Sequence, residues 1–148
     1  MTRNPVMGQR PHRVNIDGKS QTIIGKSAVA VLPGQFLKLA SGALVLAAAD
    51  AVKPLYIAGC DDKVGGSILD PIAIGDSITA DYVDETRIFA ALVKPGVAVV
   101  EGETLLAIGA GGQLEIATGA ADAIAIAFET YTVPATPVTG GHVKVRML

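Results

Sequence analysis

Tryptophan is absent from this sequence of 148 residues, and Cys60 is its sole cysteine. An intrachain disulfide is therefore excluded, which fits a reducing compartment. No apolar run reaches the roughly 18–20 residues that a membrane-spanning helix needs. The first residues, MTRNPVMGQRPHR, have no apolar stretch after their basic residues, so they do not read as a secretory signal. We expect a chain made inside a cell, without a membrane segment or a disulfide framework.

Histidine is also scarce, since only His12 and His142 are present and they lie far apart in sequence. No Gly-x-Ser-x-Gly nucleophile turn occurs. The acidic groups Asp61-Asp62 and Asp76 to Glu85 lack the ligand spacing of a calcium-binding EF-hand loop. Cys60 has no neighbouring histidine or basic residue, which favours a packed thiol over a nucleophile. We predict that the protein is not an enzyme and has no catalytic residue, metal ligand or cofactor.

Half of the residues are hydrophobic, and 17 glycines and 8 prolines divide them into short runs. Several runs alternate between apolar and polar residues, as in His142 to Met147, which is typical of a half-buried strand. Turn residues separate the runs at the spacing of a β-sandwich or barrel, and little helix is expected. The predicted strands are Phe36–Leu39, Ala43–Leu46, Leu55–Ala58, Ile78–Val83, Arg87–Val93, Thr104–Ile108, Leu114–Ile116, Ala123–Phe128 and His142–Met147. The fold class is therefore all-β, a compact sandwich or barrel-like domain.

Two parts of the sequence, at about residues 30–58 and 98–128, resemble each other. Ala30 to Leu37 aligns with Ala98 to Leu105, an offset of 68, and Gly42 to Leu46 aligns with Gly112 to Ile116, an offset of 70. Each copy reads as a strand, a glycine turn, a second strand and an Ala-Asp corner. We predict one β domain over residues 27–148, built from two similar β units.

The net charge of −2 conceals an uneven distribution. Residues 1–26 contain five basic residues and one acidic residue, a net charge of +4, and the rest of the chain carries −6. The same segment is rich in Pro, Gly and Gln, so it has little apolar surface to bury. We predict an extended basic N-terminal arm over residues 1–26 that docks on an acidic partner surface, although a solvated tail without function stays an alternative. Without interleaved aromatic residues, the arm does not suit nucleic acid.

Several stretches together are similar to one group of viral proteins. They are the polar start Met1–Gln21, the segment Ala30–Leu39, Ile74-Gly75-Asp76-Ser77-Ile78, Ala90–Gly96, Glu101–Leu106 and Gly112-Gln113-Leu114. The pattern, which covers most of the chain, resembles the capsid decoration (cement, or head-stabilising) proteins of tailed bacteriophages. The resemblance implies a β-rich structural virion protein, made in the host cytoplasm, that binds the outer capsid surface.

The same resemblance implies a homotrimer at three-fold and quasi-three-fold positions of the shell, with the major capsid protein as partner. An N-terminal arm would bridge capsid subunits, and we expect Arg3, Arg10, Arg13 and Lys19 to make the capsid contacts. The resemblance implies no catalytic residue. Neither nucleic acid nor membrane is expected as a partner.

The alternative is a non-enzymatic module that binds a glycan or a small molecule between subunits. Aromatic side chains would then line the site, and the candidates are Tyr56, Tyr82 and Tyr131. Three tyrosines and no tryptophan offer few stacking surfaces for sugars, which makes this alternative the weaker one.

Overall fold

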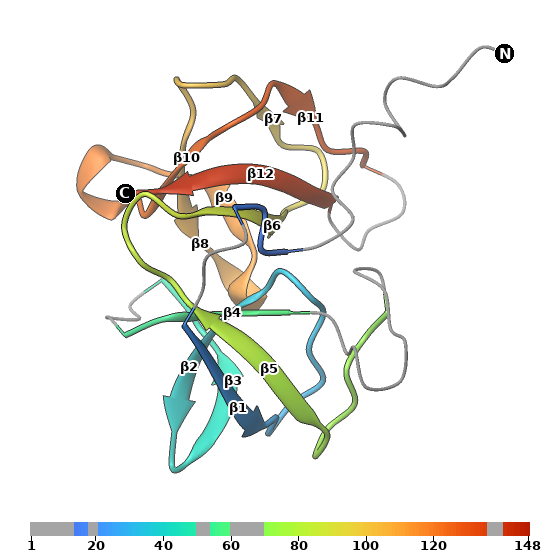
Figure 1. Ribbon diagram of the computed structural model, residues 1–148. Helices are drawn as coiled ribbons and strands as arrows, with labels where there is room; N and C mark the ends of the chain where they lie inside the picture. Colours follow the sequence, from blue (N-terminus) through green and yellow to red (C-terminus); the bar gives the residue numbers. More distant parts are fainter. Residues whose placement is uncertain (1–13, 18–20, 50–53, 60–69, 136–140) are drawn as a thin grey trace, which may run out of the picture.

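The computed structural model describes residues 14–17, 21–49, 54–59, 70–135 and 141–148. Figure 1 shows two β lobes, one above the other, with the first half of the chain in the lower lobe and the second half in the upper lobe. Helical structure in these ranges is limited to two single 3-10 turns, Ala110–Gly112 and Ala120–Asp122. No helix among these residues has the length and apolar character to cross a membrane. The all-β prediction is confirmed.

The lower lobe is a sheet of five strands in the order β1-β5-β4-β2-β3. The strands are β1 (Thr22–Lys26), β2 (Phe36–Ala40), β3 (Ala43–Leu46), β4 (Tyr56–Ala58) and β5 (Ser77–Tyr82). All four neighbouring pairs in this order are antiparallel. The outer strands β1 and β3 meet at one parallel bridge between Ser27 and Leu44, beyond which Ala28 N–H donates to the Leu44 carbonyl at 3.0 Å.

The upper lobe is a closed barrel of five strands in the order β10-β12-β6-β9-β8. The strands are β6 (Ile88–Val93), β8 (Leu105–Ile108), β9 (Leu114–Ile116), β10 (Ala125–Ala127) and β12 (Gly141–Met147). The barrel closes at a parallel pair between Val93 and Leu114, beyond which Lys94 N–H donates to the Leu114 carbonyl at 2.9 Å. The parallel pair that closes the barrel therefore corresponds to the single Ser27–Leu44 bridge of the lower lobe, which is not a closed barrel.

The two lobes share one connectivity. In chain order β1 to β5 correspond to β6, β8, β9, β10 and β12, and each strand has corresponding neighbours in the two sheets. The additional two-stranded sheet of β7 (Ala98–Val99) and β11 (Tyr131–Thr132) pairs Val99 with Tyr131, and the lower lobe has a corresponding bridge between Val31 and Ile72. Register places Leu37 with Leu106, one residue beyond the partner that the sequence alignment assigns.

Glycines at corresponding turns adopt corresponding conformations. Gly34 and Gly102, before the first hairpin of each lobe, have φ of 92° and 75°. Gly42 and Gly112, inside the hairpins, have φ of 80° and 70°. Residues other than glycine rarely adopt these left-handed conformations, so the glycine turns fix where each hairpin reverses.

Each lobe has its own cluster of buried side chains, and the end of the interior is closed differently in the two. In the lower lobe the rings of Tyr56 and Tyr82 fill this end, with centroids 4.8 Å apart. Pairing places Ala125 and Met147 at the corresponding positions of the upper barrel. The upper barrel therefore has the small side chain of Ala125 where the lower lobe has the ring of Tyr56.

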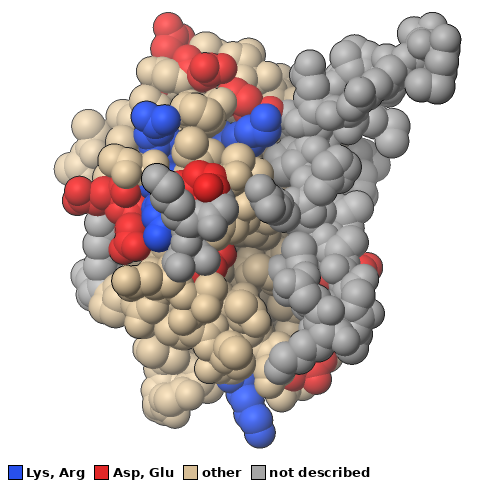
Figure 2. Space-filling model, viewed as in Figure 1, with Lys and Arg blue, Asp and Glu red and all other residues tan. Residues whose placement is uncertain are grey.

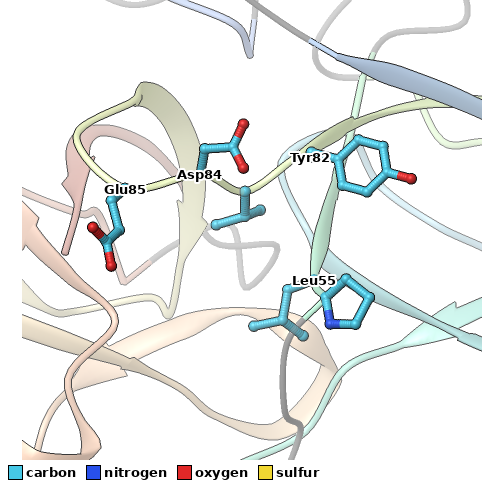
Figure 3. Close-up of a pocket in the computed structure, with 6 residues that line it drawn as sticks. Leu55, Tyr82, Asp84 and Glu85 are labelled. Atoms are coloured by element: carbon cyan, nitrogen blue, oxygen red, sulfur yellow. The ribbon is translucent and has the colours of Figure 1, made fainter.

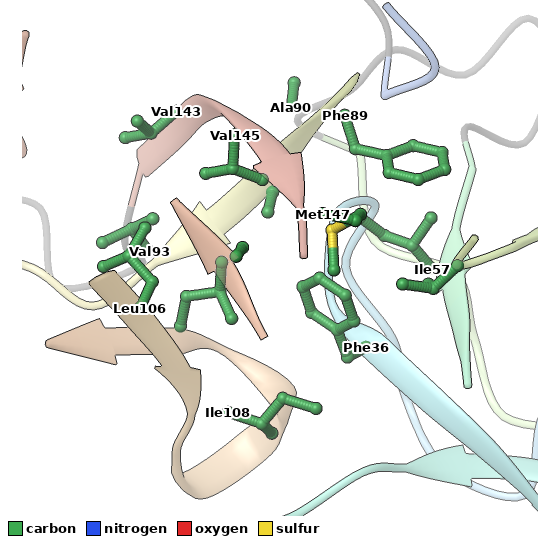
Figure 4. Packing of buried hydrophobic residues seen from close by; sticks show 14 of the residues in the cluster. Phe36, Ile57, Phe89, Ala90, Val93, Leu106, Ile108, Val143, Val145 and Met147 are labelled. Atoms are coloured by element: carbon green, nitrogen blue, oxygen red, sulfur yellow. The ribbon is translucent and has the colours of Figure 1, made fainter. Parts of the chain in front are cut away.

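Two side chains from the outer face of the lower lobe, Phe36 and Ile57, belong to the buried cluster of the upper barrel. Figure 4 shows Phe36 and Ile57 beside Met147, at the end of the barrel interior. Both are fully buried. The lower lobe therefore covers the open end of the upper barrel, and the two lobes form one packed unit.

The loop Pro33–Gln35 makes polar contacts between the lobes. Leu92 N–H donates to the Gly34 carbonyl at 3.0 Å, and Gln35 Nε2 donates to the Gly111 carbonyl at 3.0 Å. His142 Nε2 lies 2.7 Å from the Pro33 carbonyl oxygen. The side chains and backbone of this loop therefore fix the lower lobe against β6 and β12.

Residues 14–17 lie beside β6 as a short extended segment. Val14 is only 2% exposed and belongs to the upper cluster, against which Ile16 also packs. Farther along, residues 22–26 form β1. Apolar residues within 14–26, a part of the predicted arm, thus pack against both lobes. Of the predicted arm, residues 1–13 and 18–20 lie outside the described residues.

Candidate functional site

The four residues predicted to contact a capsid, Arg3, Arg10, Arg13 and Lys19, all lie outside the described residues. The structure does describe the segment that follows the first thirteen residues. Ala90 N–H donates to the Val14 carbonyl at 2.7 Å, and Ile16 N–H donates to the Ile88 carbonyl at 3.1 Å. Val14, which directly follows residues 1–13 in the sequence, is therefore held against β6.

A charged group reinforces this attachment. Asp17 Oδ2 accepts a hydrogen bond from Ile88 N–H at 3.3 Å, and Asp17 Oδ1 lies 4.0 Å from Arg87 Nη1. The same guanidinium lies 3.7 Å from Asp84 Oδ2 through its Nη2 atom. Arg87 thus joins the N-terminal segment to the connection between the two lobes.

A hollow of about 630 Å³ lies where β5 ends and the chain passes to the upper lobe. It is lined by Pro54, Leu55, Tyr82, Val83, Asp84 and Glu85. Figure 3 shows Leu55 and Tyr82 on one side and the carboxylates of Asp84 and Glu85 on the other. Leu55 and Val83 are buried, so the hollow has an apolar floor and an acidic rim.

Of the three tyrosines considered for a ligand site, Tyr82 alone lines this hollow. Its ring is tilted by 58° against that of Tyr56, so part of its surface is already in contact. Burial raises the pKa of Tyr56, and a hydrogen bond with Tyr82 and that residue's charge act in the same direction. Tyr131 lies on β11 in the upper lobe. The structure thus brings two of the three candidates together.

His142 occupies the junction between the lobes. Burial lowers the pKa of His142, and the hydrogen bond with the Pro33 carbonyl opposes this effect. A neutral imidazole is therefore favoured at this position. Its packing against Gly34 is close, because a Cβ atom on that glycine would lie 2.9 Å from the ring. This histidine serves the packing of the two lobes.

Within the described ranges, no group of three or more His, Cys, Asp or Glu side chains is placed to hold a metal ion. Cys60, the thiol considered in the sequence, lies outside those ranges. The prediction that the protein is not an enzyme stays a prediction.

Charge is unequally distributed over the face in Figure 2. Lysine and arginine gather on the upper lobe, with acidic side chains around them, and the lower lobe is mostly uncharged on this side. The lower lobe also carries strongly exposed apolar side chains. Ile24 on β1 is 67% exposed and Ile74, before β5, is 69% exposed. Large apolar side chains are also exposed on the upper lobe, among them Ile116 and Leu148.

The sequence patterns missed β1 and the attachment of residues 14–17. Thr22–Lys26 lies inside a basic, polar stretch and is followed by a short loop, so its composition indicates an arm. The signal that identifies it is the pair Ile23-Ile24, two β-branched residues that sheet formation favours.

No protein-family model and no curated protein sequence matches this chain. Among solved structures, the chain is similar to the N base of head fiber gp8.5 of bacteriophage phi29. The superposition has a TM-score of 0.59 with 12% sequence identity, and it covers 88% of this chain and 95% of the other. At this identity the likeness establishes a shared fold, which extends over nearly the whole of both chains.

Proposed function

We propose that this chain is a structural virion protein of a tailed bacteriophage. It decorates and stabilises the outer surface of the capsid, binds as a trimer at three-fold and quasi-three-fold positions, and is made in the host cytoplasm. Its N-terminal arm bridges subunits of the major capsid protein. This role requires no catalysis, and binding depends on side-chain packing and on contacts between strands.

The observation that supports this proposal most is the fold shared with the base of a phage head fiber, which covers 88% of this chain. The sequence resemblance to capsid decoration proteins points to the same class of virion component by an independent route. A shared fold by itself does not imply a shared function, so the proposal also needs the arm.

The arm is supported by charge and by the attachment of residues 14–17. Residues 1–13 contain three arginines and no acidic residue. They start from Val14, which is 2% exposed and hydrogen-bonded to β6. A basic segment fixed at one end can search for an acidic surface without losing its hold on the body. Many copies at symmetric positions then give strong total binding from weak single contacts.

The trimer is supported by the exposed apolar side chains of the lower lobe. Ile24, Leu39 and Ile74 are each at least half exposed, on a lobe that shows few charges in Figure 2. A closed homo-oligomer would cover such surface. Sedimentation velocity on the purified chain measures the number of copies, and a trimer is the expected result.

Binding to capsids tests the proposal. Expanded heads that lack this protein are incubated with the full chain, and bound copies are counted by quantitative mass spectrometry. Removal of residues 1–13 is expected to reduce occupancy at least tenfold while the body stays folded. This deletion spares Val14 and Ile16, which pack in the core. Undiminished occupancy would contradict the role of the arm, and no binding by the full chain would contradict the function.

A matched pair of variants separates the charge of the arm from charge in general. Arg3→Gln, Arg10→Gln and Arg13→Gln together remove three positive charges from the arm. Lys38→Gln, Lys94→Gln and Lys144→Gln remove the same number from the body. Only the first set is expected to weaken binding. Lys19→Gln, added to the three arginine substitutions, measures the contribution of that residue.

A second candidate function is the binding of a small molecule or glycan at the hollow beside Tyr82. The observation that favours it is the combination of an exposed part of that ring with two carboxylates, Asp84 and Glu85, which can accept hydrogen bonds from hydroxyl groups. Titration with a panel of neutral mono- and disaccharides, followed by NMR of the backbone amides, tests it. Shifts confined to residues 82–85 would support this function, and their absence would remove it.

A further inference from the structure

The N-terminal half of β6 is paired on both of its edges. On one edge it pairs with β12. On the other edge residues 14–16 lie antiparallel to it, with Asn15 opposite Phe89. Ala90 N–H donates to the Val14 carbonyl, and Ile16 N–H donates to the Ile88 carbonyl. The Val14 carbonyl and the Ile16 N–H, two residues apart, thus occupy this edge of β6.

The strand β1 is the counterpart of β6 in the lower lobe. At corresponding residues, the backbone groups of the two strands point in the same direction relative to the neighbouring strand. Tyr82 N–H donates to the Gln21 carbonyl at 2.9 Å, as Met147 N–H donates to the Arg87 carbonyl at 2.8 Å. Because hydrogen-bonding direction alternates along an antiparallel strand, the backbone groups of Thr22 and Ile24 point away from β5. They are the counterparts of Ile88 and Ala90.

At Thr22–Ile24 this outer edge of β1 has no strand paired with it among the described residues. The strand β3 reaches β1 only at the bridge between Ser27 and Leu44, because the hairpin turn at Ser41-Gly42 reverses the chain there. The side chains of Thr22 and Ile24 are exposed, Ile24 by 67%. Figure 1 shows β1 at the front of the lower lobe, with residues 14–17 near β6 above it. An open strand edge of this kind accepts an extended segment.

We propose that in the isolated protein the edge of β1 at Thr22–Ile24 binds residues 1–13 of a second copy of this chain, which add a strand antiparallel to β1. The observation that carries the proposal is the difference between two corresponding edges, one occupied by Val14–Ile16 and the other open.

The length and position of residues 1–13 select this occupant. The segment directly precedes residues 14–16, which already pair with the edge of β6. At about 3.3 Å per extended residue it spans about 43 Å. A domain of this size has a radius of gyration of about 15 Å, so the segment is long enough to cross to a neighbouring copy. Within it, Val6-Met7-Gly8 offers a carbonyl and an N–H two residues apart, without a proline.

Cross-linking of the full chain tests the proposal. A photoreactive benzoylphenylalanine replaces Thr22, and copies labelled with ¹⁵N are mixed with unlabelled copies before irradiation. The expected product is a cross-link from position 22 of one isotope class to residues 1–13 of the other. Cross-links to other segments, or within one copy only, would overturn the proposal.

A variant of the edge gives a second test. Proline at position 24 removes the N–H that points outward, and edge strands tolerate proline where the N–H has no partner within the sheet. Ile24→Pro is expected to weaken self-association at least tenfold, measured by sedimentation equilibrium. Ile24→Val keeps both the N–H and an apolar β-branched side chain, and is expected to stay within about threefold of the native chain. Equal association by both variants would contradict strand addition.

A measurement without substitutions keeps the test valid if Ile24→Pro does not fold. Hydrogen exchange of the Ile24 amide in the native chain is expected to slow at least tenfold between low and high micromolar concentration. Removal of residues 1–13 should abolish this dependence. Exchange that is independent of concentration would overturn the proposal. All three tests use the isolated protein, so their failure is separate from failure of capsid binding.

Discussion

Gly42 and Gly112 occupy corresponding hairpin turns and have similar left-handed conformations, yet their surroundings differ. A Cβ atom on Gly42 would meet nothing within 4 Å, whereas on Gly112 it would lie 2.6 Å from the Phe36 carbonyl oxygen. Gly42→Ala is therefore expected to cost about 1 kcal/mol, the conformational penalty alone. Gly112→Ala adds a clash with the backbone of the other lobe and should cost at least about 1 kcal/mol more. Urea denaturation measures both, and equal losses would contradict the close approach.

His142 is expected to make stability depend on pH. Its pKa is lowered in the folded protein from an ordinary value of 6.5, because burial disfavours the charged ring. Below pH 6.5 the unfolded chain binds the proton more readily than the folded one, so stability is present above this pH and is lost as pH falls through the folded pKa. His142→Gln should remove this part of the decline, seen in thermal midpoints measured from pH 7.5 to pH 5. His12→Gln, measured in parallel, accounts for the other histidine.

Short elements carry much of the packing in this molecule, and residues 14–17 are the clearest case. Val14 is buried in the upper cluster, so Val14→Ala is expected to cost about 2 kcal/mol through lost apolar contact and a small cavity. Val100, which is 44% exposed, provides the matched control, and Val100→Ala should cost less than about 0.5 kcal/mol. Guanidinium denaturation compares the two. Similar costs for the two variants would mean that Val14 contributes no more to the free energy of unfolding than an exposed valine does.

The strands that the sequence predicts correctly are those with clear alternation and a turn at each end. The segment His142 to Met147 alternates, and β12 is there with Val143, Val145 and Met147 buried. The strand β1 escaped prediction because Gly25 and the polar residues around it lower the apolar signal of the whole segment. The strands β7 and β11 have two residues each, too few for any periodicity. Local pattern therefore finds strands with a clear apolar signal and turns beside them, and it misses those that are polar, such as β1, or only two residues long.

At the scale of the whole molecule, the two lobes are expected to unfold together. Phe36 belongs to the lower sheet but is buried in the upper cluster, so neither lobe keeps its core when the other unfolds. Calorimetric and van't Hoff enthalpies should then agree. Phe36→Ala is expected to lower the stability of the whole unit by about 3–5 kcal/mol and to leave a single transition. Two separate transitions in the native chain would show that the lobes are independent.

The pairing between strands could not be predicted from local patterns in the sequence. The repeat of turn residues indicates two similar units, but which strands close a barrel depends on side chains far apart in sequence, such as Val93 and Leu114. The same holds for the hollow, which brings Leu55 beside Glu85. The predicted contact residues Arg3, Arg10, Arg13 and Lys19 followed from charge alone, and charge locates a segment without determining its partner.

The order of the strands along the chain has a consequence for synthesis. All five strands of the lower sheet exist once residue 82 has been translated, because β5 is the last of them. The upper barrel depends on β12, which pairs with both β6 and β10 and ends at Met147. On the ribosome the strands of the lower sheet therefore emerge first, and Phe36 and Ile57 lack their packing partners until the later strands emerge. A premature stop anywhere before β12 leaves that apolar surface exposed for good, so truncated chains are expected to aggregate or be degraded.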